Sequence, residues 1–284
     1  MAQPPASALT AASVSWFEPD WPVPPSVRAL FTTRLGGTSD APWDALNLGA
    51  HVGDRAEHVA QNRALLQSAV RERGGGELVF LNQVHGCDVL DVDACPVSQP
   101  LQGQAADGSI TARPDQALAM MVADCLPVLI TDRSGQRVGA FHAGWRGLAG
   151  VQGRGILESA VEAFVQARPP SLPVMASDLL VWLGPCIGPA AFEVGDEVRQ
   201  VFGSAQPEAL SLFQPVAKRP GHWLADLAGL ARLRLRAVGV SAVYGNDGTR
   251  AWCTYTQSAS FFSHRRDSQR FGGTGRMAAC IWLV

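Results

Sequence analysis

The stretch from residue 125 to residue 142 constrains the fold of this chain most strongly, because it predicts a β-hairpin with a thiol at one end and an imidazole at the other. The apolar runs 126–131 and 136–141 are typical of paired strands, and residues 132–135 form a turn signal. A turn centred between residues 133 and 134 places Cys125 directly opposite His142. Cross-strand partners share one face, with Cβ atoms ~4.5–5.5 Å apart. Bonds of about 2.3 Å to sulfur and 2.0 Å to nitrogen would let one zinc ion join these side chains.

A third side chain of similar chemistry, His85, lies in a loop-forming run between two predicted strands. Taken singly, a free cysteine is usually a small buried hydrophobe, and a buried histidine usually satisfies a local hydrogen bond. Together, His85, Cys125 and His142 indicate either a metal site or a Cys–His pair. Two imidazoles and one thiolate leave one tetrahedral position open, which is typical of catalytic zinc. Asp124 is a candidate proton shuttle if the strand has ended there, and otherwise caps a loop amide.

Composition and charge narrow the class of partner. The 284 residues are 47% hydrophobic, enough for a large core, and a net charge of -2 lacks the basic surplus typical of binding to nucleic acid or anionic membranes. We therefore expect a small-molecule partner, no nucleic acid and no membrane. The six cysteines are spread singly without CxxC pairs, and the first residues lack the basic and apolar pattern of an export signal. These features favour a reducing, cytoplasmic location.

The chain is expected to form one catalytic domain over residues 26–284, after a loose arm rich in Ala, Ser and Pro at residues 1–25. Apolar periodicity alternates between helical and strand-like segments, which predicts a layered α/β fold with a mixed sheet. Besides the hairpin, the predicted strands cover 28–33, 78–81, 88–92, 117–123, 179–183, 242–244 and 278–283. The predicted helices cover 55–73, 148–167 with a proline stop at 168–170, 193–202 and 222–237.

A glycine-rich run at residues 33–39 is a candidate anion site. Arg34 offers a bidentate guanidinium, and Gly36 and Gly37 expose backbone amides. Taken alone, however, the run is more simply interpreted as an ordinary glycine turn. His51 either lines a pocket or belongs to a loop that caps the following helix through Asp54.

Nine ordered motifs give this chain a family resemblance from about residue 28 to its C-terminus. They are TRLGGTS (33–39), LNL (46–48), HVGD (51–54), NR (62–63), NQVHG (82–86), ADCLP (123–127), HAGWRG (142–147), GPCIG (184–188) and TGR (274–276). The chain resembles the YfiH-type family. That family was once labelled polyphenol-oxidase laccases, is now treated as purine nucleoside phosphorylases, and includes the peptidoglycan editing factor.

The resemblance implies a metal site at His85, Cys125 and His142, usually zinc, in a single α/β sandwich related to cysteine hydrolases. It further implies phosphorolysis of adenosine, inosine, guanosine and methylthioadenosine, together with adenosine deamination. The sequence departs from the family pattern at His264, where a tyrosine is common, and at 268–273, which lengthens a loop. These departures bear on the role of the tail in the pocket.

On this interpretation, zinc activates water for deamination while Asp124 moves the proton. In phosphorolysis, Arg34 with the amides of Gly36 and Gly37 holds phosphate, and Asn47 and His51 complete the substrate contacts. Two other functions stay open. A metal-free Cys125–His142 hydrolase would act on peptidoglycan precursors. A copper polyphenol oxidase is disfavoured, because six histidines are too few for a multicopper cluster.

Overall fold

Two large mixed sheets form the centre of the molecule in the computed structural model, which describes residues 14–96, 98–167 and 174–284. The first sheet has the order β1-β2-β14-β6-β3, with strands Trp16–Phe17, Val27–Thr32, Met277–Leu283, Gln116–Val122 and Glu77–Phe80. The second has the order β13-β9-β7-β8-β5-β4, with strands Ala242–Gly245, Leu179–Leu183, Leu126–Asp132, Val138–Ala143, Gly108–Thr111 and Val89–Asp91. A smaller sheet, β10-β12-β11, joins Glu193–Gly195, His222–Ala225 and Phe213–Pro215.

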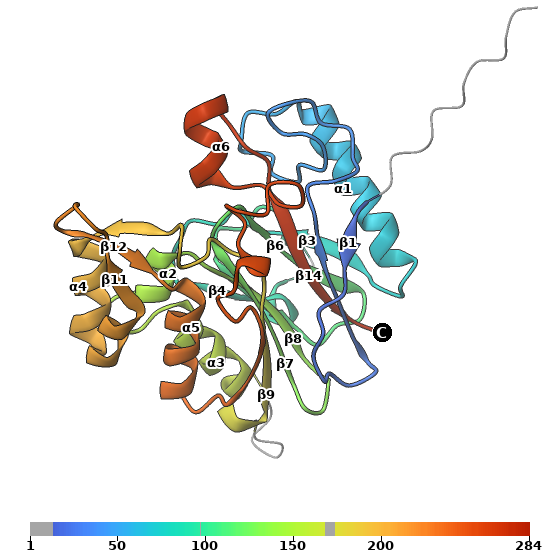
Figure 1. Ribbon diagram of the computed structural model, residues 1–284. Coiled ribbons are helices and arrows are strands. Elements are labelled where there is room, and N and C mark those ends of the chain that lie inside the picture. The colour runs from blue at the N-terminus through green and yellow to red at the C-terminus, as the bar shows by residue number, and fades with distance from the viewer. Residues whose placement is uncertain (1–13, 97, 168–173) are drawn as a thin grey trace, which may run out of the picture.

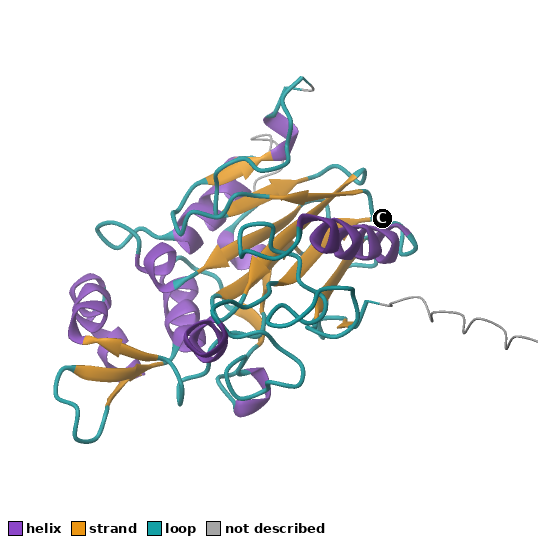
Figure 2. Cartoon of the chain, turned by 90° about the horizontal axis from the view of Figure 1, so that it is seen from above, coloured by secondary structure: helices purple, strands orange, loops and turns teal. Residues whose placement is uncertain are grey.

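Helices cover the outer faces of the two large sheets, giving four layers (Figures 1 and 2). The helices are α1 (Ala56–Arg71), α2 (Trp145–Ala149), α3 (Ile156–Gln166), α4 (Asp196–Ala205), α5 (Leu227–Ala237) and α6 (His264–Phe271). Short 3-10 helices lie at Val92–Ala94, Ala176–Asp178, Pro207–Leu212 and Arg250–Trp252. Three apolar clusters lie between α1 and the first sheet, between the two sheets, and between the second sheet and α3 with α5. The predicted α/β class with mixed sheets is confirmed.

The strands of the inner layers are apolar on both faces, since each face packs on another layer. In β6, Leu118 and Met120 face the second sheet, whereas Ala119 and Met121 face α1. Side chains alternate with a period of two along a strand, so one short run supplies two cores. This is why these segments appear as unbroken apolar runs in the sequence.

The predicted hairpin is confirmed, but its predicted register is wrong. Strand β7 pairs with β8 so that Pro127, not Cys125, lies opposite His142. The turn is centred one residue later than expected, because the Asp132 carboxylate accepts a hydrogen bond from the Ser134 amide at 2.7 Å and Gly135 takes a φ of 61°. The register therefore shifts by two residues, and an even shift keeps each side chain on its predicted face. Cys125 and His142 still meet on one side of the sheet.

The helix predicted over residues 148–167 is divided into α2 and α3. Gly150 has a φ of 62° and packs directly against the backbone of Arg154, which turns the chain between the two helices. The proline stop predicted at 168–170 lies outside the described residues. Helix α2 begins two residues after β8 ends, which places Trp145 and Arg146 at the carboxyl end of β8, close to His142 in the chain.

The C-terminal third of the chain differs most from the sequence prediction. Residues 193–195 and 222–225 are strands of the small sheet, so α4 and α5 begin later than predicted. Strands of three or four residues show too little alternation to be recognised. Helix α6, which is absent from the helices predicted from the sequence, begins at the N-cap Ser263 and ends at Gly272 with a φ of 76°.

Order begins earlier than the arm predicted over residues 1–25 allows. Strand β1 pairs with β2, and Trp21 is 9% exposed. Residues 1–13 lie outside the described part of the chain. Among the described residues, no helix has the length and apolar character needed to cross a membrane.

Candidate active site

Three side chains from separate segments meet where β7 begins and its antiparallel neighbour β8 ends in the second sheet. His85 comes from the loop after β3, Cys125 precedes β7, and His142 lies near the end of β8. Their ligand atoms all lie within 4.8 Å of one another, and Cys125 Sγ is 3.9 Å from His85 Nε2. The two imidazole rings meet edge to face with centroids 4.7 Å apart. The predicted convergence of these residues is confirmed.

The loops that carry His85 and Cys125 adopt unusual backbone conformations. His85 has a φ of 62°, and Asp124, which precedes the thiol, has a φ of 84°. A residue other than glycine in this region costs on the order of 1–3 kcal/mol and persists only when its surroundings hold it. The strand has therefore ended before Cys125, and local hydrogen bonds fix the side chains at the site.

One buried carboxylate, that of Asp107, holds both histidines. It accepts hydrogen bonds from the backbone amides of Val84, His85 and Gly86 at 3.1, 2.9 and 2.6 Å, and from Nδ1 of His142 at 2.8 Å. Burial opposes ionisation of Asp107, but these hydrogen bonds and the charge of His142 lower its pKa. Because a carboxylate accepts, the proton on His142 lies on Nδ1, which leaves Nε2 for a ligand.

Sequence reasoning missed Asp107. The residue precedes Gly108, and an Asp-Gly pair signals a turn, so the strand β5 that begins there was not predicted. Strand β5 pairs with β8 at Gly108 and Phe141, and the amide of His142 donates to the carbonyl of Asp107 at 2.7 Å. Only this long-range pairing places the carboxylate beside the histidine.

The cluster is suited to a metal ion in its donor set and in its spacing. Tetrahedral zinc with bonds of about 2.0 and 2.3 Å separates its nitrogen and sulfur ligands by about 3.5 Å. Cys125 Sγ and His85 Nε2 are 3.9 Å apart and the three donors lie within 4.8 Å of one another, so small side-chain movements would bring them to this spacing. Gly144 leaves the required space, since a Cβ there would lie 3.0 Å from the His85 ring and 3.1 Å from Cys125 Sγ.

The thiol and the imidazole of His142 polarise each other. Burial alone would raise the pKa of Cys125, but the charge of His142 and hydrogen bonds with both histidines lower it to about 6. Burial would lower the pKa of His142, but the thiolate and Asp107 raise it to about 9. Cys125 therefore carries the thiolate that metal binding or nucleophilic attack requires.

Two cavities open from the cluster and share His85, Ala123, Cys125 and His264 in their walls. The larger has a volume of about 480 Å³ and is lined by residues from α2, β10, α4 and the start of α6. Its apolar walls include Trp145 and Phe192, and its polar groups include Arg146, Glu193 and Glu197. The smaller, of about 180 Å³, is bounded by His51, Gln83, His142 and Arg276.

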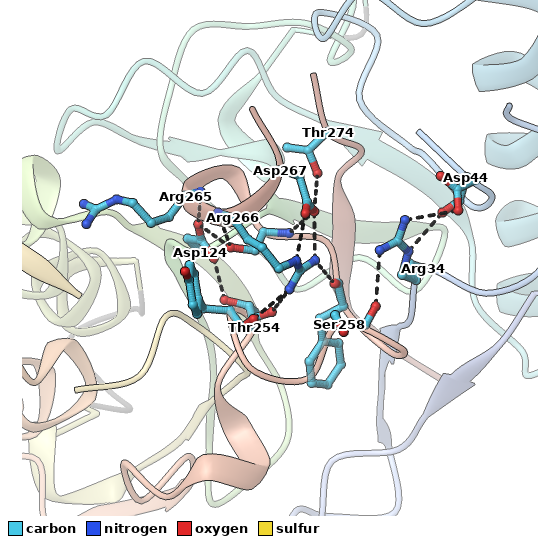
Figure 3. A network of polar contacts seen from close by, with 12 residues as sticks. Arg34, Asp44, Asp124, Thr254, Ser258, Arg265, Arg266, Asp267 and Thr274 are labelled. Carbon is cyan, nitrogen blue, oxygen red and sulfur yellow. Dashed lines mark hydrogen bonds and ion pairs between the residues drawn. The ribbon is translucent and has the colours of Figure 1, made fainter. Parts of the chain in front are cut away.

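Of the predicted substrate contacts, only His51 lines either of these cavities. Figure 3 shows Arg34 turned toward Asp44 and Ser258; it donates to the Asp44 carboxylate at 3.2 Å and to the Ser258 carbonyl at 3.2 Å. It borders a different hollow. Gly36 and Gly37 have φ values of 83° and 76°. The next amide, of Thr38, donates to Asn62 and so does not face a ligand.

Asn47 is also outside the cavity walls, yet it positions a residue that lines them. Its side chain is buried, and its Oδ1 accepts hydrogen bonds from the amides of Gly49 and Arg276, both at 2.9 Å. Its amide nitrogen donates to Asp54 at 2.9 Å. Asn47 thus ties the loop before α1 to the start of β14.

The carboxylate of Asp124 is occupied by protein groups (Figure 3). It accepts hydrogen bonds from Thr254 Oγ1 at 2.6 Å, Ser263 Oγ at 3.0 Å and the Arg265 amide at 2.6 Å. These contacts anchor the first turn of α6 to the segment that carries Cys125. The alternative in which Asp124 caps a loop amide describes this arrangement, and the proton-shuttle role stays a prediction.

Comparison with known proteins identifies the family of this chain. Residues 28–284 match the model of the family described as multi-copper polyphenol oxidoreductase laccase. The chain belongs to this family. Its relatives include a protein of Pseudomonas aeruginosa named purine nucleoside phosphorylase, which is 48% identical, with 95% of this chain and 98% of the relative covered. Another is the purine nucleoside phosphorylase YfiH of Escherichia coli K12, 44% identical, with 94% and 98% covered.

Solved structures of the laccase-type family have the same fold. Protein NMB0706 of Neisseria meningitidis is 40% identical and superposes with a TM-score of 0.77, over 95% of this chain and 99% of that chain. YlmD of Geobacillus stearothermophilus is 33% identical with a TM-score of 0.80, over 95% and 96% of the two chains. The relation to cysteine hydrolases stays a prediction.

Proposed function

We propose that this protein is a zinc-dependent purine nucleoside phosphorylase that cleaves adenosine, inosine, guanosine and methylthioadenosine, and that also deaminates adenosine. The observation that carries the proposal is the position of the His-Cys-His cluster between two cavities of different size and polarity: His85 and Cys125 lie in their common wall, and His142 lines the smaller one. Phosphorolysis uses two substrates of unequal size, a nucleoside and the phosphate that cleaves it. Relatives that align over nearly their whole length carry the name purine nucleoside phosphorylase.

His85, Cys125 and His142 would hold the zinc ion. When bound, zinc supplies Lewis-acid chemistry, which polarises a substrate atom and makes water acidic enough to attack near neutral pH. The family description names copper, but the described residues gather one cluster of three ligands. A set of two imidazoles and one thiolate with an open position is typical of catalytic zinc.

The larger cavity is the proposed nucleoside site. Its volume of about 480 Å³ falls within the range of about 300 to 1,000 Å³ that is usual for ligand pockets. Trp145 and Phe192 offer apolar surface to a purine ring, and the carboxylates of Glu193 and Glu197 can accept hydrogen bonds from N–H groups of a base. The chain itself therefore binds and orients the nucleoside beside the metal ligands.

One specific observation favours a second candidate, the metal-free hydrolase acting on peptidoglycan precursors. Cys125, His142 and Asp107 form a thiol, an imidazole and an orienting carboxylate in the order that cysteine hydrolases use. The lowered pKa of Cys125 would make it a nucleophile without metal. Metal removal separates the two candidates, because only the first needs an ion.

The test is turnover of the four nucleosides by the purified full chain, followed by chromatography, with and without inorganic phosphate. The proposal requires free base and the 1-phosphate of the nucleoside's own sugar to form only when phosphate is present, which is 5-methylthioribose 1-phosphate for methylthioadenosine and ribose 1-phosphate for the other three. Inosine should form from adenosine even when phosphate is absent. Zinc-loaded protein that releases no base from any of the four nucleosides would contradict the phosphorylase assignment.

A further inference from the structure

Arg276 is a partly buried cation that faces the smaller cavity without a counter-ion. No carboxylate lies within ion-pair distance of its guanidinium among the residues of the described ranges, although the cavity wall brings it close to the metal ligands. Burial lowers the pKa of Arg276, and the charges of the Cys125 thiolate and of Asp124 act in the opposite direction without offsetting it. Neither group forms an ion pair with the guanidinium, so the cavity can take a further negative group directly against Arg276.

The guanidinium is held in place while part of its hydrogen-bonding capacity stays open to the cavity. Nη1 donates to the carbonyls of Thr274 and Gly275, both at 3.2 Å, and the amide of Arg276 donates to Asn47. Within the described residues, Nε and Nη2 have no protein acceptor. Gly49 packs on the stem, where an added Cβ would lie 2.7 Å from Arg276 Cγ. An arginine fixed in this way presents a rigid fork suited to a tetrahedral oxyanion.

Other groups around the smaller cavity reinforce its positive potential. Burial, followed by the charges of Arg276 and Arg63, lowers the pKa of His51. Burial and the charge of Arg276 likewise lower the pKa of His264. Arg63 contacts the Leu48 carbonyl, Met121 and the Phe80 ring, none of which is an anion. Two guanidinium groups thus act on this cavity, and the Asp124 carboxylate, which also acts on Arg276 and His264, is engaged by Thr254, Ser263 and the Arg265 amide.

The size of the smaller cavity restricts what this anion can be. Its volume of about 180 Å³ lies below the range of about 300 to 1,000 Å³ usual for whole organic ligands. The cavity admits a small oxyanion and excludes a nucleoside. It ends at His85, Cys125 and His142, so an anion held there lies next to the reacting groups.

From this geometry we infer that the smaller cavity is the binding site for inorganic phosphate, with Arg276 as its main ligand and His51 and His264 beside it. The inference rests on the proposed function and assigns its second substrate. It replaces the sequence prediction for Arg34, whose guanidinium Asp44 already neutralises at 3.2 Å. Phosphate and nucleoside would then approach the cluster from two sides, through walls that share His85 and His264.

The test is direct binding of radiolabelled inorganic phosphate to the zinc-loaded full chain by equilibrium dialysis, without nucleoside. Arg276→Gln should weaken binding tenfold or more, the effect of losing one charge-assisted hydrogen bond. Gly49→Ala keeps the charge but displaces the Arg276 stem, and should weaken binding in the same direction. Arg34→Gln tests the rival assignment, and Arg270→Gln, at an exposed position on α6, is the matched control. Both should bind phosphate as the wild type does.

Steady-state kinetics provide a second measurement, in which Arg276→Gln should raise the KM for phosphate far more than the KM for nucleoside. Wild-type phosphate affinity in folded Arg276→Gln, or, where that variant does not fold, in Gly49→Ala, would overturn the inference. Loss of binding in Arg34→Gln alone would also overturn it. Phosphate binding that depends on Arg276 without nucleoside cleavage would leave the site in place and refute the phosphorylase. If Arg276→Gln carries out phosphorolysis with an unchanged KM for phosphate, the phosphorylase assignment stands and the phosphate site proposed here is refuted.

Discussion

The carboxylate of Asp107, immediately before the neighbouring strand β5, accepts a hydrogen bond from Nδ1 of His142 at 2.8 Å. This relationship decides the chemistry of the site, because it turns Nε2 of the imidazole toward Cys125 and His85. The same carboxylate binds three consecutive amides of the loop that carries His85. One buried anion thereby couples the positions of two proposed metal ligands.

Replacing Asp107 with Asn should therefore weaken zinc binding more than it weakens the fold. An amide has one accepting oxygen where the carboxylate has two, so it cannot accept from Nδ1 of His142 and from all three loop amides, and the two histidines are held less firmly. Changes of this kind typically cost about 10–100-fold in metal affinity. Competition with a chromophoric chelator measures the affinity, and Asp115→Asn, at an exposed surface position, is the matched control. Unchanged zinc affinity in Asp107→Asn would show that this carboxylate serves the loop alone.

The sequence predicted the parts of the fold that depend on local periodicity. Helix α1, most strands of the two large sheets, and the hairpin itself all follow from local patterns in the sequence. The two-residue register error in the hairpin left each side chain on its predicted face, because side chains alternate with a period of two along a strand. The small sheet and β5 depend on pairing between distant short segments, and nothing local in their sequences indicates it.

The three residues of the cluster were predictable because their chemistry is rare at strand ends, whereas the groups around them were not. The pair Asp107-Gly108 has the composition of a turn, which hid the carboxylate. Arg276 follows Gly275 in a short motif, and only the pairing of β14 in the first sheet places it beside His51. Arg34 was chosen for its glycine neighbours, but the fold turns it toward Asp44. Ser263 and Gly272 are local cap signals that would have revealed α6.

Cys125→Ala should abolish phosphorolysis and deamination while the fold survives. The thiol contributes one of three ligands and is partly exposed to the cavities, so its loss removes chemistry and little packing. Turnover by chromatography, measured together with thermal melting, tests this prediction. Cys95→Ala, at another partly exposed cysteine, should behave as the wild type. Turnover at the wild-type rate in Cys125→Ala would refute the whole site assignment.

Gly144→Ala offers a steric test of the same site. Gly144 has a φ of -65° and a ψ of 157°, which alanine adopts without strain, so the main effect is the added methyl group. That group would lie 3.0 Å from the His85 ring and 3.1 Å from Cys125 Sγ, closer than ordinary contact. We expect lower zinc affinity with a melting temperature near that of the wild type. Full zinc affinity would mean that the ligands adjust freely.

Asp124→Asn should reduce stability, because the new amide nitrogen replaces one carboxylate oxygen and cannot accept the hydrogen bonds made to that oxygen. Losing a hydrogen bond to a charged group typically costs about 1.5–3 kcal/mol. Urea unfolding measures this loss, with Asp40→Asn at an exposed position as the control. The zinc content should stay unchanged. Normal stability combined with a selective loss of deamination would instead support the proton-shuttle role.

Metal removal separates the zinc enzyme from the cysteine hydrolase. A zinc ligand stays coordinated through the cycle, so purified protein should carry about one zinc ion per chain. A strong chelator should then stop nucleoside turnover until zinc is restored. Chelation should also expose the thiolate, whose pKa of about 6 in the metal-free site makes it reactive near neutral pH.

Mass-spectrometric mapping of alkylation therefore completes the test, since Cys125 should be labelled faster without metal than with it. Cys280 provides an internal control: it is buried, and burial raises the pKa of its thiol, so its labelling should be slow in both states. If protein verified to be metal-free cleaves nucleosides at the full rate, zinc has no catalytic role. The Cys125–His142 pair, oriented by Asp107, would then be the reacting group, because the geometry that prepares a metal ligand also prepares a nucleophile.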